Sequence, residues 1–267
     1  MMTAAAIETL WRAGKRAEAI EAARAVAGEA DDATENTRLL DIADVLQTMA
    51  EETGRSRDAD AAVEVATLLR RRAWLQDDPQ SVHASQGLVM WYARTGRYQE
   101  AEAELARSRA MAERFVSQSQ APLRTLLSLS ADVAGQAGRL EDAIAFLQRA
   151  IEVEQTPASR GADELGPLYR ALAQALLRAD RVDEAAAALD SSLRAPRRRL
   201  SGSEEAEVLS QLAHLRERQG QVHVALPLME RAVERCQAEL GPNHPHTARH
   251  RQNLARLRAL DPQGDAS

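Results

Sequence analysis

The sequence predicts an all-α protein, built as a tandem array of helical hairpins. A six-residue phrase returns at near-constant intervals, apolar residues on both sides of it recur at helical spacing, and aromatic residues make up only 3% of the 267 residues. Few aromatic and many alanine side chains favour closely packed helices over sheets. With 45% hydrophobic residues, the chain can bury a core of globular type.

The recurring phrase marks the repeat unit. It reads GKRAEA at Gly14, GRSRDA at Gly54, GRYQEA at Gly96, GRLEDA at Gly138, DRVDEA at Asp180 and GQVHVA at Gly220. Successive copies start 40 to 42 residues apart, and no insertion breaks the register. Internal repetition at such a period is the signature of a repeat architecture.

Each copy of the phrase is expected to form the turn of a hairpin. Before Gly54, apolar residues in the range 39–50 recur three and four positions apart, which predicts a first helix. After Gly138, the range 140–151 has the same spacing and predicts a second helix. Glycine ends a helix well because it adopts the left-handed conformation without a Cβ clash. Asp180 is the exception among the six turns.

The sixth position of every copy is alanine. A small side chain lets two helices approach closely, so these alanines are predicted to be buried where the two helices of a hairpin meet. They are Ala19, Ala59, Ala101, Ala143, Ala185 and Ala225.

Proline and helix N-cap residues predict loops between hairpins at 76–81, 117–122, 156–167 and 195–204. Each hairpin can bury its apolar face only against its neighbours. Residues 3–260 are therefore predicted to form one domain of six hairpins and a closing helix. Residues 261–267 are predicted to be a disordered tail.

These features resemble the tetratricopeptide repeat, which places a leucine and a small residue in the first helix, glycine at the turn, and a large residue and alanine after it. The first-helix pairs are Leu88 and Val89, Leu172 and Ala173, and Leu212 and Ala213, and the large residues are Tyr98, Leu140, Val182 and Val222. The stretch LGPNHPHTARHRQNLARL, residues 240–257, is similar to the kinesin-light-chain subtype. The resemblance implies an α-solenoid, a right-handed superhelix whose first helices line a concave groove for peptides.

The closing helix and the single cysteine have structural interpretations. The helix carries Arg249, Arg251, Arg256 and Arg258, which we expect to give the polar outer face that a terminal repeat needs. Cys236 has no second cysteine to pair with and falls in a helical pattern, so we interpret it as a structural residue.

Charge and hydropathy point away from nucleic acid and membranes as partners. The net charge is −6 and the pI near 5.6, so no overall basic field attracts phosphate groups. The sequence shows no secretory leader pattern and no 18-residue apolar run, and we expect a cytoplasmic protein. Lys15 is the only lysine, and this bias towards arginine favours a bacterial origin.

Two clusters invite a chemical interpretation. His244, His246 and His250 could share a helix face and bind zinc, but His244 with Pro245 also matches the subtype's loop motif, and no Cys, Asp or Glu completes the set nearby. We therefore predict no metal and no cofactor. The chain contains no GxxxxGK(S/T), GxGxxG, GxSxG or HExxH motif, so no catalytic residue and no enzyme activity are predicted.

The run Arg197–Ser201 has three interpretations. It could be a basic docking patch, or a phosphorylation target in which arginine pairs with a phosphate on Ser201, or a solvated loop. Ser201 and Ser203 ahead of Glu204 are also typical of a helix N-terminus, which accounts for them without regulation.

The resemblance also implies which side chains line the groove, by their position relative to each turn. These are Asp41, Asp44, Glu51, Glu52, His83, Gln86, Met90, Arg94, Asp132, Arg170, Gln174, Arg178, His214 and Arg218. The hypothesis is a polar peptide whose basic part faces the acidic second repeat and whose acidic part reaches the later arginines. The alternative is an ordinary solvated helix surface.

The sequence therefore predicts a scaffold or adaptor that binds a partner polypeptide or peptide in its groove. One alternative is a regulatory sensor whose superhelix changes pitch when a signalling peptide binds. Another is the non-catalytic partner of a bacterial kinase or ATPase signalling system. The sequence carries no signal for an oligomeric state.

Overall fold

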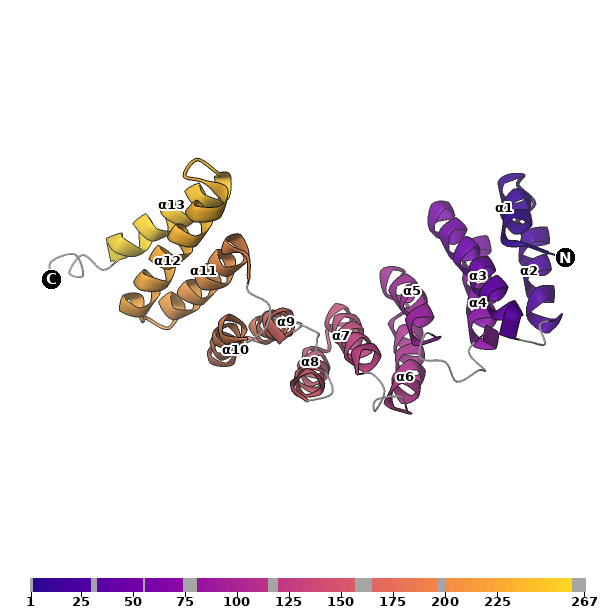
Figure 1. Ribbon diagram of the computed structural model, residues 1–267, viewed down its shortest axis with the longest axis horizontal. Coiled ribbons are helices and arrows are strands. Elements are labelled where there is room, and N and C mark those ends of the chain that lie inside the picture. The colour runs from indigo at the N-terminus through magenta and orange to yellow at the C-terminus, as the bar shows by residue number, and fades with distance from the viewer. Residues whose placement is uncertain are drawn as a thin grey trace. The chain divides into compact units, whose positions relative to one another are not determined.

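The structure, a computed structural model, describes residues 2–29, 33–54, 56–73, 81–114, 120–156, 165–195 and 200–260. Across these residues it contains thirteen α-helices and no β-strand (Figure 1). The all-α prediction is confirmed.

Contacts divide the chain into two compact units, residues 1–137 and 138–267. The first unit contains α1 (Ala4–Arg12), α2 (Arg16–Glu29), α3 (Ala33–Thr53), α4 (Arg57–Ala73), α5 (Ser81–Arg94), α6 (Tyr98–Arg114) and α7 (Ala121–Gln136). The second contains α8 (Leu140–Gln155), α9 (Leu165–Arg178), α10 (Val182–Arg194), α11 (Gly202–Arg218), α12 (Val222–Leu240) and α13 (Pro245–Leu260). The prediction of one domain over residues 3–260 remains a prediction, and the tail 261–267 lies outside the described residues.

Within each unit, helices that are consecutive in sequence pack as hairpins. The pairs α1–α2, α3–α4 and α5–α6 do so in the first unit, and α9–α10 and α11–α12 in the second. We call the odd-numbered helices up to α11 the first helices and the even-numbered ones the second helices. First helices also contact first helices, as in α1–α3 and α5–α7, and α2 contacts α4. The closing helix α13 packs on α12.

The turns have the predicted backbone conformation. The five glycines that open a phrase, Gly14, Gly54, Gly96, Gly138 and Gly220, have φ between 72° and 80°, and Asp180 has φ 58°. No atom lies within 4 Å of a Cβ built on any of these glycines. Glycine is therefore favoured at these positions by backbone conformation and not by lack of space.

The alanines of the phrase are buried as predicted. Ala19, Ala59, Ala101, Ala185 and Ala225 are 0% exposed and Ala143 is 2% exposed. Their small side chains occupy the position at which a larger residue would push the two helices of a hairpin apart.

The predicted loops extend too far, because helices begin inside them. Helix α7 begins at Ala121, α9 at Leu165 and α11 at Gly202. Proline suggested a loop in the first two cases, but it is well tolerated in the first turn of a helix, where its missing N–H has no partner to lose. Ser201 caps α11 in a capping box with Glu204, which confirms the helix N-terminal interpretation. Residues 196–199, most of the arginine run, lie outside the described residues.

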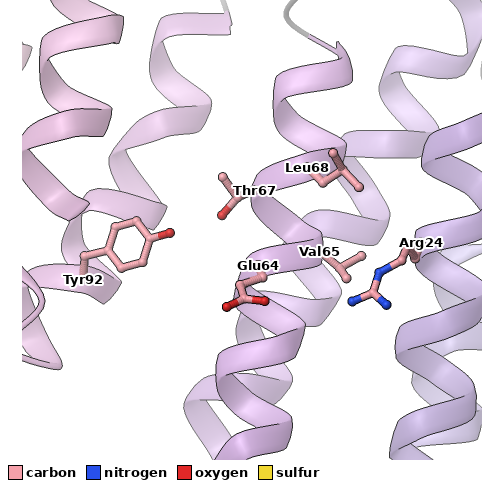
Figure 2. Close-up of a pocket in the computed structure, with 6 residues that line it drawn as sticks. All are labelled: Arg24, Glu64, Val65, Thr67, Leu68 and Tyr92. Atoms are coloured by element: carbon pink, nitrogen blue, oxygen red, sulfur yellow. The ribbon is translucent and has the colours of Figure 1, made fainter.

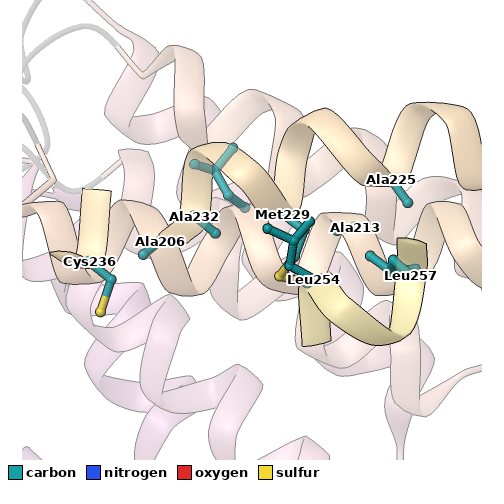
Figure 3. Close-up of a cluster of buried hydrophobic side chains, with 9 residues drawn as sticks. Ala206, Ala213, Ala225, Met229, Ala232, Cys236, Leu254 and Leu257 are labelled. Atoms are coloured by element: carbon teal, nitrogen blue, oxygen red, sulfur yellow. The ribbon is translucent and has the colours of Figure 1, made fainter. Parts of the chain in front are cut away.

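One buried hydrophobic cluster of the second unit joins its last three helices (Figure 3). Its buried residues are Ala206, Leu209, Ala213, Ala225, Met229, Ala232, Cys236, Leu254 and Leu257. Cys236 is 0% exposed, with a free thiol that accepts a hydrogen bond from the Thr247 hydroxyl at 3.4 Å. The cysteine thus packs as a core residue, consistent with its structural interpretation.

The arginines of α13 do more than form a polar outer face. They are exposed, but Arg249, Arg256 and Arg258 form ion pairs with Glu207, Glu217 and Glu230 of the preceding hairpin, and Arg251 donates to the Pro242 carbonyl and the Gln237 side chain. The arginines therefore lie on an exposed face, as expected, and also contact the preceding hairpin. The arginine side chain is long enough for its guanidinium group to contact an acid of the neighbouring helix and water at the same time.

Candidate functional site

All of the side chains that were predicted to line a groove lie on first helices. In the first unit, α3 carries Asp41, Asp44, Glu51 and Glu52, α5 carries His83, Gln86, Met90 and Arg94, and α7 carries Asp132. In the second, α9 carries Arg170, Gln174 and Arg178, and α11 carries His214 and Arg218. The side chain of His83 lies outside the described part of the structure. Each unit therefore has its own surface of first helices, which we describe in turn.

The four predicted acids of α3, Asp41, Asp44, Glu51 and Glu52, are exposed. Asp41 and Asp44 are three positions apart, and so lie on one side of the helix. Asp44 is already engaged, because its carboxylate accepts a hydrogen bond of 2.6 Å from the Nη2 atom of Arg70 on α4. The Arg70 side chain is only 4% exposed, so this ion pair connects a buried cation to the surface.

The sequence analysis did not assign Arg70 to this site, although its spacing from Asp44 could have indicated the contact. Arg70 follows Asp44 by 26 residues across the turn of its hairpin. Arg231 follows Glu205 by the same 26 residues across the last turn and forms an ion pair of 2.7 Å with it. An acid before the turn and an arginine 26 positions later is therefore a pattern that indicates a contact within a hairpin.

Helices α3 and α5 contact each other through residues that were predicted to bind the basic part and the acidic part of the peptide. Arg94 forms an ion pair of 3.0 Å with Glu51, and its guanidinium lies 5.1 Å from the centre of the Trp91 ring. Gln47 of α3 donates a hydrogen bond of 3.0 Å to the Gly87 carbonyl of α5. The predicted acidic and basic regions of the first unit thus partly neutralise each other across the boundary between two repeats.

Two further side chains of this surface differ in character from the ion pairs. Met90 is 61% exposed, although it is a large apolar residue. Asp132 on α7 is an exposed residue, but the protein atoms around its carboxylate displace part of the water that would stabilise the charge, which raises its pKa. The surface of α3, α5 and α7 therefore combines acids, an ion pair and an apolar side chain.

In the second unit, the predicted residues on α9 follow one another at intervals of four positions and share one side of the helix. Arg170 is half-buried, and Gln174 and Arg178 are exposed. On α11, Arg218 pairs with Asp180 at 3.5 Å, and the exposure of both side chains makes this a weak contact.

The closing helix contributes residues to the α11 surface that the sequence did not assign to it. Arg256 donates to both carboxylate oxygens of Glu217, which lowers the pKa of that carboxyl group. The His214 ring lies 3.4 Å from Arg256 and 3.5 Å from the Asn253 amide. The surface predicted for α11 therefore continues onto α13, with Asn253 and Arg256 next to His214.

The three histidines of the cluster differ in their exposure. The rings of His244 and His246 are 5.2 Å apart, whereas His250 is 1% exposed, with its pKa lowered mainly by burial. Over the described ranges, no group of three or more His, Cys, Asp or Glu side chains is placed to hold a metal ion. In the same ranges, no helix is both long enough and apolar enough to cross a bilayer.

Comparison with known proteins identifies the repeats. The family model for the tetratricopeptide repeat matches residues 80–156 and 204–262, which together make up half of the chain. The chain belongs to the tetratricopeptide repeat family. Arrays of these repeats generally mediate protein–protein interactions and typically act as non-catalytic scaffolds.

Solved structures share the fold. BtubC (BKLC) from P. vanneervenii aligns over 81% of this chain and 83% of its own, with a TM-score of 0.60 and 18% identity. Nearly identical TPR-like repeats of a putative kinesin light chain from Podosopora anserina align over 70% of this chain and 89% of theirs, with a TM-score of 0.55 and 20% identity. No curated protein matches the chain in sequence. The resemblance to kinesin-light-chain repeats is thus confirmed at the level of the fold.

Proposed function

We propose that this tetratricopeptide repeat protein is a scaffold or adaptor of the bacterial cytoplasm, which binds a partner polypeptide along its first helices. The observation that carries the proposal is the exposed surface of α3 and α5. There Asp41 and Glu52 are exposed acids without a hydrogen bond or ion pair among the described residues, and Met90 exposes 61% of its surface. Glu52 acts on Arg12 of α1 only through its charge, which together with the stronger effect of Glu8 raises the pKa of Arg12. Two helices that pack together and carry an exposed apolar side chain on one and acids without an ion pair on the other suit a partner segment with both basic and apolar residues.

The test reverses only acids that make no direct hydrogen bond or ion pair with a described residue. Asp44 is left unchanged because its loss would leave the buried Arg70 without its partner, and Glu51 because it pairs with Arg94. The partner is identified by affinity purification from the native organism with mass spectrometry. Calorimetry then compares its affinity for the native chain and for the double variant Asp41→Lys with Glu52→Lys, for which we expect binding at least about tenfold weaker.

The matched control is Glu113→Lys with Glu234→Lys, which changes the net charge equally at two exposed acids on the second helices α6 and α12. We expect this control to bind like the native chain. Equal affinity of the native chain and the α3 variant would exclude the acidic surface as the binding site.

One contact favours the alternative of a peptide-responsive sensor. The Glu51–Arg94 ion pair joins two repeats, so a peptide that pairs with either residue must compete with this link between α3 and α5. A sensor should gain thermal stability from short peptides alone, whereas a scaffold should co-purify with one large protein. The melting temperature with and without such peptides distinguishes the two.

A further inference from the structure

A pocket lies in the first unit, between α2, α4 and α5 (Figure 2). It has a volume of about 310 Å³ and is lined by Arg24, Glu64, Val65, Thr67, Leu68 and Tyr92. Tyr92 and Met90 are two residues apart, which places them about 200° from each other around α5. The pocket therefore faces another side of the repeats than the proposed binding surface.

The pocket has an apolar wall with one exposed aliphatic side chain. Val65 is 1% exposed and Tyr92 7% exposed, so both are fixed by packing, whereas Leu68 is 45% exposed. The Thr67 hydroxyl donates to the Val63 carbonyl at 2.7 Å, so its hydrogen is not available to a ligand. A flexible aliphatic chain could cover the exposed Leu68 surface and remove it from water.

The polar groups of the pocket are not balanced in charge. Arg24 is neutralised by an ion pair of 2.6 Å with Glu21. Glu64 makes no hydrogen bond or ion pair with any described residue. The Tyr92 hydroxyl points towards α4, where Glu64 and Thr67 lie (Figure 2), and it too lacks a hydrogen-bond partner in the described part of the chain. The Tyr92 ring packs against the Arg97 guanidinium, 4.8 Å from its centre. The pocket therefore offers an unpaired carboxylate and a phenol oxygen to a ligand.

We propose that this pocket binds the side chain of a basic residue, arginine or lysine, from a partner polypeptide. The aliphatic part of the side chain would cover Leu68, and its charged end would donate hydrogen bonds to Glu64 and Tyr92. The volume lies at the lower limit of ligand pockets, about 300 Å³, which suits one side chain better than a cofactor. The site adds a second contact with the partner, on a different face from the proposed binding surface.

The test uses side-chain probes on the full chain. Amide chemical shifts are followed by NMR during titration with N-acetyl-arginine methylamide and N-acetyl-lysine methylamide, and with the norleucine and glutamate analogues as comparisons. We expect saturable shifts around Glu64, Leu68 and Tyr92 with the two basic probes only. The stronger of the two basic probes identifies the preferred residue.

Two variants connect the binding to the pocket. Glu64→Gln should weaken binding of the basic probe about fivefold, as expected for a partly exposed ion pair, and Leu68→Ser should weaken it through loss of the aliphatic contact. Glu234→Gln, an exposed acid on α12, is the matched control and should not change binding. Absence of saturable shifts, equal binding of the norleucine or glutamate probe, or an unchanged affinity of Glu64→Gln would overturn the proposal.

This result is separable from the test of the α3 surface. The variant Asp41→Lys with Glu52→Lys leaves all six pocket residues intact, so it should bind the basic probes as the native chain does. The pocket proposal and the proposed function can thus fail independently.

Discussion

At the scale of single residues, backbone conformation and burial explain why particular amino acids occupy particular positions. Gly220 is required by a φ of 75°, and not by crowding, since a Cβ at this position would have no atom within 4 Å. Gly166, in the first turn of α9, has an ordinary helical φ, and a Cβ there would meet its nearest atom at 3.8 Å. The two glycines therefore allow the same substitution to be tested in two conformations.

Gly220→Ala should lower the free energy of unfolding by about 1 kcal/mol, because alanine is strained in the left-handed conformation. Gly166→Ala should leave stability unchanged or raise it by roughly 0.5 kcal/mol, because alanine fits there and reduces the freedom of the unfolded chain. Urea denaturation followed by circular dichroism measures both. Equal losses in the two variants would show that the turn conformation is not the cause.

His250 should make stability depend on pH. Its folded-state pKa lies below the ordinary value of 6.5, mainly because of burial, with Arg249, His246 and His214 also disfavouring the charge and Glu207 favouring it. Well above pH 6.5 both states are neutral at this residue and its contribution is complete. Below that pH the unfolded chain takes up a proton that the folded chain resists, so stability falls as pH falls.

The comparison that isolates this effect is His250→Gln against His223→Gln, since His223 is exposed on α12. Between about pH 7.5 and 5.5, the native chain and the His223 variant should lose more of their unfolding free energy than the His250 variant does. Parallel pH profiles for all three proteins would exclude His250 as the titrating group.

At the scale of elements, a helix packs on its neighbours through apolar side chains and also makes polar contacts with them. Helix α13 shows both, because Leu254 and Leu257 enter the core of the second unit while three of its arginines pair with acids of α11 and α12. The ion pairs of Arg249 and Arg258 join exposed side chains and contribute little stability each, whereas Arg256 pairs with a Glu217 side chain that is only 18% exposed. Burial of leucine therefore contributes most to holding the helix in place, and the ion pairs of the arginines add to it.

Leu257→Ala should destabilise the second unit by about 2 to 5 kcal/mol, because it removes a side chain that is 0% exposed and leaves a cavity. Hydrogen exchange measured by mass spectrometry should then show faster exchange in α13. Leu260→Ala, in the same helix at a position 54% exposed, should change neither quantity appreciably. Faster exchange in both variants would indicate fraying of the helix end instead of a lost core contact.

At the scale of the whole molecule, the sequence predicts repetition well and contacts between repeats poorly. The six turns could be located in the sequence because each repeat of 40 to 42 residues contains its own left-handed turn residue and its own periodic apolar residues. The placement of the candidate residues on first helices followed from that register. The ion pairs among these residues could not be predicted from the register. Glu51 and Arg94 are 43 residues apart and meet only because α3 and α5 pack together.

The sequence by itself determined the fold class, the positions of the turns and the buried alanines, because each depends on backbone preference and on the periodicity of apolar residues. Only the tertiary structure decided which charged side chains neutralise each other, that α13 extends the surface of α11, and that Glu64 and Tyr92 meet at one pocket. A charged side chain can reach many partners from a given position. The packing of neighbouring helices selects one of them.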